Sequence, residues 1–322
     1  MVDVIRLKAP GGPDNLGYVT IELPAPGDGD VRIRQTAIGV NFLDIYQRQG
    51  LYPLPQGIPG VEAVGVVAAL GGNVTSLQVG DRIVYAGAPV GAYASERNLP
   101  AWRAVKLPAT LADAQVAAVF LKAMTVQMLL TRIYPVGARD HVLVHSAAGG
   151  LGQLLVRRAA GLGAAVIGCV SSEPKAAVAR AAGAAQVIVG RDADFAAAVA
   201  GFTAGRGVDV AYDGVGGATL AKTLACVRPF GVVVSIGQAA GPIPPLDVNE
   251  LGPRRSLMLA RPSVMGFMND PDDYRAAAAA VLGLIVSGVF SAEATRYPLR
   301  DAARAQADLE AGRSSGSLLL VP

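Results

Sequence analysis

The sequence predicts an α/β protein of two domains, one mostly antiparallel β and one built on a doubly wound parallel sheet. The chain has 322 residues, and single hydrophobic cores stop growing near about 250 to 300 residues. The pattern also changes near residue 110, where short β-like runs broken by Gly and Pro give way to apolar strands that alternate with Ala-rich helices.

The first part of the chain reads as a compact β domain. Its strand candidates are short runs at 2–7, 31–38, 63–70 and 82–86. Segments 24–29 and 52–60 are rich in Pro and Gly and therefore predict turns or loops. The second of these loops is a candidate wall of a ligand cleft.

The remainder predicts a helix over 112–130 and then alternating strands and helices. The strand candidates are 141–144, 165–170, 186–189, 208–212, 231–236 and 257–260. Near-continuous apolar strands separated by helices are typical of a parallel sheet covered on both faces. A helix is predicted over 271–285, and the strand at 318–321 needs a partner, for which the β domain is one candidate.

Composition excludes several classes of protein. Hydrophobic residues make up 52% of the chain and charged residues 16%, which disfavours disorder. The net charge of +3 comes without a run of like charges, so a dedicated nucleic-acid binder is disfavoured. The longest apolar stretch is interrupted by polar residues, and no membrane segment is predicted. Cys169 and Cys226 are isolated, which indicates a reducing, cytoplasmic setting.

A glycine-rich turn at 145–152 follows one predicted strand and precedes a predicted helix at 153–161. It contains the pattern Ala-x-Gly-x-x-Gly, in which glycines let a pyrophosphate reach the N–H groups at a helix N-terminus. Ala at the first position departs from the all-Gly pattern, and a plain packing turn is the alternative. The strand–turn–helix context favours dinucleotide binding, with contacts from Ala147, Gly149, Gly150, Leu151 and Gly152.

The end of the second strand of this domain indicates NADP. Where NAD enzymes place an acid for the ribose 2′-hydroxyl, the chain has Ser171 and Ser172. These serines can donate hydrogen bonds to a 2′-phosphate, and Lys175 can supply positive charge. Arg191, after the third strand, is a second cation within reach. Glu173 could still face a ribose, and Lys175 could be an ordinary solvated lysine.

Two further turns, at 212–217 and 235–238, fall at strand ends on the side of the sheet where ligands bind. Their glycines would let the nicotinamide half of a dinucleotide lie against the backbone, with contacts from Val215, Gly237 and Gln238. His145 ends a strand, and we expect it to pack or form hydrogen bonds rather than to catalyse.

Together these residues resemble a known family, the zinc-free, zeta-crystallin-like quinone oxidoreductases of the medium-chain dehydrogenase/reductase superfamily. The matching segments are 39–46, 50–53, 60–65, 80–85, 120–126, 145–152, 212–216, 261–263 and 316–322. The resemblance implies a GroES-like catalytic domain (1–122) and a Rossmann-type NADPH-binding domain (123–266). The C-terminal segment 267–322 is expected to return to the catalytic domain.

The resemblance also implies that no metal takes part. In zinc-dependent relatives a Cys ligand stands in the segment that matches 39–41, and a His ligand stands where Val61 precedes Glu62. Neither ligand type is present there, nor is the Cys cluster of a structural zinc lobe. Zinc prefers tetrahedral sets of thiolate and imidazole donors, so we predict no zinc.

The residues that the resemblance places at the catalytic cleft are Asn41, Asp44, Tyr46 and Tyr52, with Arg261 nearby and Thr125 against the cofactor. Without a Lewis acid, reduction depends on positioning and on hydrogen bonds to the oxygen that gains charge. Tyr46 or Tyr52 could donate to a developing phenolate, and Asn41 could hold the ribose or the acceptor. The alternative for each tyrosine is a half-buried loop anchor.

Two departures from the family pattern bear on cofactor choice. Relatives that bind the 2′-phosphate carry a tyrosine after the third strand, where this chain has Gly190. Their C-terminal arginine appears here as Arg313, displaced by one position. Lys175 must then do more of the work, and selectivity for NADPH over NADH could be relaxed.

We therefore expect a cytoplasmic, homodimeric NADPH-dependent quinone reductase that binds a small quinone in the interdomain cleft. Dimerisation is expected at the outer edge of the nucleotide-domain sheet. One alternative is an NADPH-dependent alkenal or enone reductase of the same superfamily. An alternative of another class, a dinucleotide-binding protein with an RNA-binding or structural role, is motivated only by dispersed arginines and a pI near 8.9.

Overall fold

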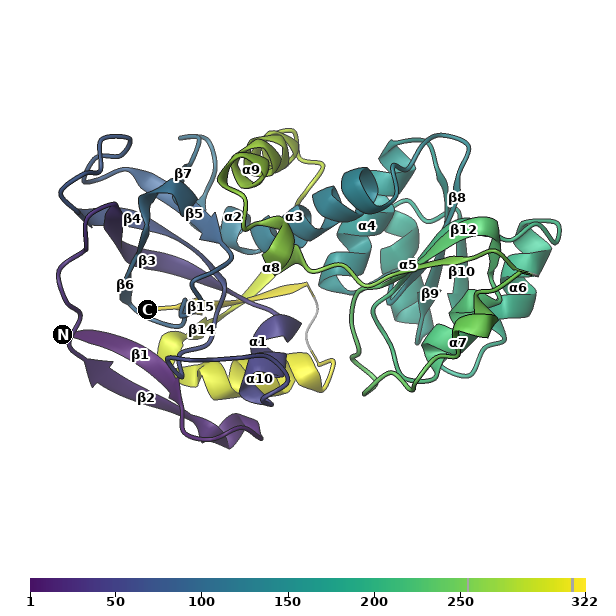
Figure 1. Ribbon diagram of the computed structural model, residues 1–322, viewed down its shortest axis with the longest axis horizontal. Coiled ribbons are helices and arrows are strands. Elements are labelled where there is room, and N and C mark those ends of the chain that lie inside the picture. The colour runs from purple at the N-terminus through teal and green to yellow at the C-terminus, as the bar shows by residue number, and fades with distance from the viewer. Residues whose placement is uncertain (254, 314–315) are drawn as a thin grey trace. The chain divides into compact units, whose positions relative to one another are not determined.

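The computed structural model describes residues 1–253, 255–313 and 316–322. The chain forms two compact units, one comprising Met1–Met124 with Val264–Pro322 and the other Thr125–Ser263. Each unit has its own main sheet (Figure 1). The sequence-based prediction of an α/β protein with one mostly antiparallel and one parallel sheet is confirmed.

The first unit contains a seven-stranded sheet in the order β14-β15-β3-β4-β5-β7, with β6 paired to β3, and a separate ribbon of β1 and β2. Its strands are β1 (Val2–Leu7), β2 (Leu16–Ile21), β3 (Asp30–Val40), β4 (Glu62–Leu70), β5 (Arg82–Ala86), β6 (Glu96–Pro100), β7 (Val105–Lys106), β14 (Ala294–Pro298) and β15 (Ser317–Val321). Its helices are α1 (Phe42–Arg48), α2 (Asp113–Ala117), α8 (Val264–Phe267), α9 (Pro271–Val286) and α10 (Ala302–Glu310), with short 3-10 turns at η1 (Pro13–Asn15), η2 (Ala101–Arg103) and η5 (Leu299–Asp301). All of its strand pairs are antiparallel except β14 with β15.

Strand β3 organises this unit because it has three partners. One edge pairs with β4, and the other pairs with β6 near Val31 and with β15 near Val40. Its inward-facing side chains, Val31, Ile33 and Ile38 among them, are fully buried in the core. The C-terminal strand therefore joins the sheet of the β domain, one of the options that the sequence left open.

The second unit is a six-stranded parallel sheet in the order β10-β9-β8-β11-β12-β13. Its strands are β8 (His141–His145), β9 (Ala165–Val170), β10 (Gln186–Val189), β11 (Val208–Asp213), β12 (Val227–Ser235) and β13 (Met258–Ala260). Its helices are α4 (Gly150–Gly161), α5 (Glu173–Ala181), α6 (Phe195–Phe202) and α7 (Thr219–Leu224), with a 3-10 turn η4 (Val248–Glu250). The first strand, β8, lies in the middle of the sheet, and the strand order reverses between β8 and β11. The carboxyl ends of these two strands therefore form the switch point at which doubly wound sheets bind ligands.

The single helix predicted over 112–130 is wrong in detail, because the structure has α2, then α3 (Phe120–Met128), then a π turn η3 (Leu129–Ile133). Tertiary hydrogen bonds replace the helical ones at the break. Ser317 donates from Oγ to the carbonyl of Ala118 at 2.6 Å, and the N–H of Leu121 donates to Glu62 Oε2 at 2.8 Å. Within the described part of the chain, no helix is both long and apolar enough to cross a membrane.

Candidate cofactor and active site

The turn between β8 and α4 brings the glycine-rich residues together. Ala147 is buried, and its N–H donates to the carbonyl of Cys169 at 3.1 Å, which fixes the turn against β9. Ser146 has a positive φ of 53°, and its carbonyl accepts the N–H of Gly149 at 2.8 Å. A Cβ built on Gly152 would lie 2.2 Å from that same carbonyl oxygen. Only glycine therefore lets the first turn of α4 pack this closely on the backbone.

Helix α4 starts three residues earlier than predicted, at Gly150, and thus includes Gly150, Leu151 and Gly152 in its first turn. Its N-cap is Gly149, which has no side chain to cap the first N–H groups. A helix N-terminus with such N–H groups binds anions because the backbone donors and the helix dipole act together. The residues present therefore fit a dinucleotide pyrophosphate.

Adjacent strand ends place the residues predicted for the 2′ position along one edge. Val170 of β9 pairs with Val189 of β10, and the N–H of Gly190 donates to the Val170 carbonyl at 2.9 Å. Ser171 directly follows β9, and Arg191 follows β10 after Gly190. Ser172 is the N-cap of α5, yet its side chain makes no capping hydrogen bond.

The charged side chains of this edge are exposed. Lys175 lies in the first turn of α5, and both it and Arg191 are exposed. Glu173, the acidic residue that could have faced a ribose, lies 3.9 Å from Arg180 in an exposed ion pair, measured from Oε2 to Nη1.

A network of buried hydrogen bonds supports the turn that follows β11. Asp213 is fully buried, and its Oδ1 accepts the N–H groups of Val215 at 2.8 Å and Gly216 at 3.0 Å. Thr223 donates from Oγ1 to Asp213 Oδ2 at 3.1 Å, and the same Oγ1 lies 2.9 Å from His145 Nε2. Burial lowers the pKa of His145, so a neutral imidazole in a hydrogen-bonding role agrees with the geometry.

Asp213 and Thr223 were missed by the sequence reasoning. The available signal was an aspartate that ends a buried strand immediately before a Gly-x-Gly turn. Nothing in the sequence connects Thr223 to it, because that contact depends on how α7 packs on β11.

The turns after β11 and β12 pack directly against each other. A Cβ on Gly237 would lie 2.8 Å from the Gly214 carbonyl oxygen, and the N–H of Ala240 donates to the Val215 carbonyl at 2.8 Å. Arg261, which follows β13, donates to Ser235 Oγ at 3.1 Å and to Gln238 Oε1 at 3.2 Å. The structure therefore groups Val215, Gly237, Gln238 and Arg261 at this edge of the sheet.

In the first unit, Asn41 and Asp44 lie together at the start of α1. The Asn41 N–H donates to Asp44 Oδ2 at 2.9 Å, and the Tyr93 hydroxyl donates to the same oxygen at 3.0 Å. Asp44 is fully buried, and burial raises its pKa to about 7. Its side chain therefore holds Asn41 and Tyr93. It has no exposed surface, although the resemblance placed Asp44 among the residues of the catalytic cleft.

The two tyrosines of the predicted cleft form an aromatic pair. Tyr46 is half-buried on α1, and Tyr52 follows it in the Pro-rich loop with 42% of its surface exposed. Their ring centroids are 5.8 Å apart in an edge-to-face arrangement. The N–H of Leu51 donates to the Tyr46 carbonyl at 2.9 Å, which ties the loop to the helix.

Two other predicted cofactor residues lie outside these groups. Thr125 is the first residue of the second unit and lies within α3. Arg313 follows α10 and forms an ion pair with Asp308, 2.8 Å between Nη2 and Oδ1. In this state its guanidinium is engaged by a carboxylate of its own unit.

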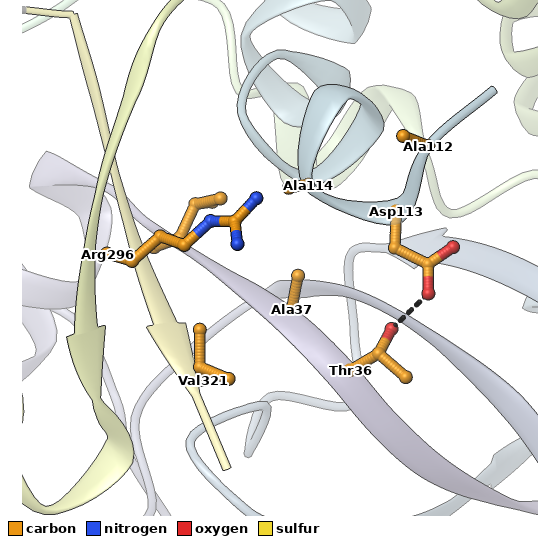
Figure 2. Close-up of a pocket in the computed structure, with 8 residues that line it drawn as sticks. Thr36, Ala37, Ala112, Asp113, Ala114, Arg296 and Val321 are labelled. Atoms are coloured by element: carbon orange, nitrogen blue, oxygen red, sulfur yellow. Dashed lines mark hydrogen bonds between the residues drawn. The ribbon is translucent and has the colours of Figure 1, made fainter.

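A cavity of about 280 Å³ in the first unit contains none of the predicted site residues. It lies beside β3, α2, β14 and β15, and Figure 2 shows the side chains of Thr36, Asp113 and Arg296 at its wall. Thr36 Oγ1 donates to Asp113 Oδ2 at 2.6 Å. Asp113 also accepts from Arg82 Nε at 3.1 Å, so its carboxylate is already paired within the protein.

Two family models match the chain and define its class. The model described as an alcohol dehydrogenase GroES-like domain matches residues 27–109, and the one described as a zinc-binding dehydrogenase matches residues 150–283. A GroES-like β unit and a parallel sheet with this strand order are the two parts of a medium-chain dehydrogenase/reductase. At the positions where zinc-dependent relatives carry Cys and His, the residues here do not fit zinc. Among the described residues, no three His, Cys, Asp or Glu gather as a metal site requires.

Relatives match from end to end. A 2-haloacrylate reductase of Burkholderia sp is 42% identical over 100% of this chain and 99% of its own, and quinone oxidoreductase 1 of Escherichia coli is 39% identical over 100% of both. The crystal structure of Escherichia coli quinone oxidoreductase complexed with NADPH has a TM-score of 0.96 at 37% identity, covering 100% of both chains. The chain belongs to the quinone oxidoreductase family of the medium-chain dehydrogenases/reductases.

Proposed function

We propose that this protein is an NADPH-dependent quinone reductase that transfers a hydride from NADPH to a small quinone without a metal ion. The observation that carries the proposal is the full-length identity of about 40% to quinone oxidoreductases, one of whose structures was solved with NADPH. The glycine-dependent turn before α4 supports the cofactor assignment, because its open N-terminus suits a pyrophosphate.

The cofactor is assigned to three groups of residues. The pyrophosphate residues are Ala147, Gly149, Gly150, Leu151 and Gly152. The 2′-phosphate residues are Ser171, Ser172, Lys175, Arg191 and Arg313, and those of the nicotinamide half are Asn41, Thr125, Val215, Gly237 and Gln238. When bound, the reduced nicotinamide supplies the hydride. Because Arg313 is paired with Asp308, Lys175 and Arg191 are the cations most open to a phosphate.

The residues that we assign to the electron acceptor hold it in place and stabilise its reduced form. A quinone oxygen gains negative charge as it is reduced, and phenolic donors placed beside it lower the barrier. Tyr46 and Tyr52 form a fixed pair that can present such a hydroxyl. The Asp44 carboxylate holds Asn41 by accepting a hydrogen bond from the Asn41 backbone N–H. Arg261 is held by Ser235 and Gln238 and adds positive charge at the end of its sheet.

Steady-state kinetics test this function. We expect turnover when NADPH is supplied with a panel of benzoquinones and naphthoquinones, and slower turnover with NADH. An absence of turnover with every quinone, in a protein shown to bind NADPH, would exclude the proposed activity.

A second activity is favoured by the 42% identity to a 2-haloacrylate reductase. The same hydride donor can reduce a carbon–carbon double bond conjugated to a carbonyl or carboxylate. The two substrates are distinguished by comparing kcat/KM for a quinone with kcat/KM for an alkenal and for 2-chloroacrylate. A preference of a hundredfold or more for the alkene would replace the quinone assignment.

Further proposals concern assembly and location. The protein forms a homodimer through β13, which pairs only with β12 among the described strands and lies at the outer edge of the sheet. Met258 on this strand is 52% exposed and Phe230 on β12 is 70% exposed, an apolar edge of the kind that is normally covered. The protein acts in the cytoplasm, in keeping with two free cysteines, and cell fractionation tests this location.

A further inference from the structure

Glu62 is a buried carboxylate that the proposed reaction has not yet used. It begins β4 and is 1% exposed. Its Oε1 accepts a hydrogen bond from Asn41 Nδ2 at 2.8 Å, and its Oε2 accepts one from the N–H of Leu121 at 2.8 Å. Each oxygen therefore faces a donor, so both contacts require an acceptor at that position.

The backbone of the neighbouring strand is shaped around this side chain. A Cβ built on Gly39 would lie 2.2 Å from Glu62 Oε1 and 2.5 Å from Glu62 Cδ. No side chain other than hydrogen fits at position 39 while the carboxylate keeps its place. Gly39, Asn41 and Leu121 thus fix the carboxylate from three directions.

The two donors differ in their freedom to move. The N–H of Leu121 belongs to the first turn of α3 and is fixed by the backbone. The Asn41 amide can turn over, because rotation of its terminal group exchanges the carbonyl oxygen and the NH₂. A carboxylate accepts only, so it draws the NH₂ towards itself. The amide oxygen is thereby left for the first turn of α1, where the Asn41 side chain accepts from the Asp44 backbone in a capping box.

We propose that Glu62 is a positioning residue that sets the orientation of the Asn41 amide and thereby decides which polar atom Asn41 presents to the cofactor or acceptor. This inference rests on the proposed function in one respect, the assignment of Asn41 to the ligand site. Glu62 itself contacts neither substrate nor cofactor in this proposal.

The neighbours of Glu62 favour its ionised form against the effect of burial. Burial is the largest influence and raises the pKa of Glu62, whereas the Lys122 charge and the hydrogen bonds from Asn41 and Leu121 act to lower it. Lys122, in the same turn of α3 as Leu121, has its own pKa lowered by burial and raised by Glu62 and Asp44. Asp44, whose Oδ2 accepts the backbone N–H of Asn41, is the other carboxyl group of this cluster.

The Glu62→Gln variant separates orientation from packing. Glutamine has nearly the same shape but offers one acceptor and one donor. The Leu121 N–H cannot move, so it keeps the carbonyl oxygen of the new glutamine as its acceptor, and the NH₂ of the new side chain faces Asn41. Two NH₂ groups cannot bond to each other, so the Asn41 amide must rotate to offer its oxygen. The core and the start of α3 are preserved, whereas the atom that Asn41 presents is exchanged.

The experiment is a double-mutant cycle with Asn41→Ala. We expect Glu62→Gln to lower kcat/KM with NADPH and a quinone, or to raise the Kd for NADPH measured by fluorescence, by about tenfold or more, as for other hydrogen bonds to charged groups. In the Asn41→Ala background the same change should alter both quantities by less than about twofold. Equal losses in the two backgrounds, or no loss in either, would overturn the inference.

Two further measurements keep the outcomes distinct. Ser317→Ala removes a buried hydrogen bond to Ala118 near the same helix start, and it should lower the Tm without the kinetic loss. The side-chain ¹⁵N resonance of Asn41, identified by its loss in Asn41→Ala, should shift in Glu62→Gln whether or not the protein reduces quinones. An unshifted resonance would contradict the reorientation, whereas a wild type without quinone turnover would contradict only the proposed function.

Discussion

Single glycines decide how closely the backbone can approach itself and a ligand in the second unit. Gly152 lies under the Ser146 carbonyl, and Gly237 lies against the Gly214 carbonyl. The Ala-x-Gly-x-x-Gly pattern predicted a turn that a ligand can approach closely, but not the contact of Gly152 with Ser146. The contact of Gly237 with Gly214 joins two turns that follow different strands, so a local pattern could not predict it either.

Gly152→Ala should abolish tight NADPH binding. The added Cβ would lie 2.2 Å from the Ser146 carbonyl, so the turn or the helix start must shift, and we expect the Kd for NADPH to rise at least about tenfold. Gly161→Ala is the matched control. It lies at the other end of α4 with nothing within 4 Å of its Cβ, and it should leave Kd unchanged and raise stability by up to about 1 kcal/mol. Similar Kd values for the two variants would contradict the prediction.

Lys175→Ala should raise the KM for NADPH by about tenfold and leave the KM for NADH almost unchanged, because only NADPH carries a 2′-phosphate for the ammonium group to pair with. Steady-state kinetics with both cofactors provide the measurement. Lys222→Ala, an exposed lysine on α7, is the control and should affect neither constant. A parallel rise for both cofactors would assign Lys175 to some other part of the site.

Asp44 should make stability fall as pH rises. Burial raises its pKa from an ordinary 3.8 to about 7 in the folded protein, so the folded state holds a proton that the unfolded state releases between about pH 4 and pH 7. Its contribution is therefore complete below pH 4 and is lost as pH rises through 7. Urea unfolding at pH 5 and pH 8 should show wild type losing stability relative to Asp44→Asn. A difference that stays constant with pH would refute this.

The boundary between α2 and α3 is set by tertiary hydrogen bonds and not by the local sequence. The Ala-rich pattern at 112–130 predicted one helix, but the Ser317 hydroxyl and the Glu62 carboxylate take over hydrogen bonds at the junction of α2 and α3. Both partners are distant in sequence, so local propensity could not locate the break. By contrast, the apolar strands of the second unit were predictable, because strands buried on both faces of a parallel sheet must be apolar throughout.

The edge strand β13 allows the dimer proposal to be tested. Met258→Lys places a charge on the exposed apolar edge and should shift the protein from dimer to monomer in sedimentation velocity at micromolar concentration. Val286→Lys is the matched control, since Val286 is similarly exposed on α9 in the other unit, and it should leave the dimer intact. A wild type that sediments as a monomer would disprove the proposal.

At the scale of the whole molecule, the sequence predicted a mostly antiparallel sheet followed along the chain by a parallel one. It also led us to expect that the last strand returns to the antiparallel sheet, where β15 pairs with β3. It selected the residues that the structure groups at the glycine-rich turn, while the roles proposed for Ser171, Lys175, Tyr46 and Tyr52 stay predictions. It could not predict the buried polar partners, Glu62 for Asn41 and Thr223 for Asp213, because these partners are brought together only by packing between elements.

Chelation should leave the enzyme active. Segment 39–41, which matches the position of a Cys ligand in zinc-dependent relatives, and Val61, which matches the position of a His ligand, offer neither thiolate nor imidazole. We expect unchanged kcat after dialysis against EDTA and far less than one zinc per chain by elemental analysis. A zinc-dependent alcohol dehydrogenase treated in parallel provides the positive control. Activity that disappears with the chelator and returns with zinc would contradict the metal-free assignment.

The pairing of β15 with β3 has a consequence for synthesis on the ribosome. Strand β3 emerges early, yet its partner β15 is made only after the whole second unit has been translated. At typical elongation rates of about 5–20 residues per second, the end of β3 near Val40 waits many seconds for that partner. The parallel sheet can therefore complete its folding on the nascent chain while the first sheet still has an open edge, a period in which a chaperone could bind.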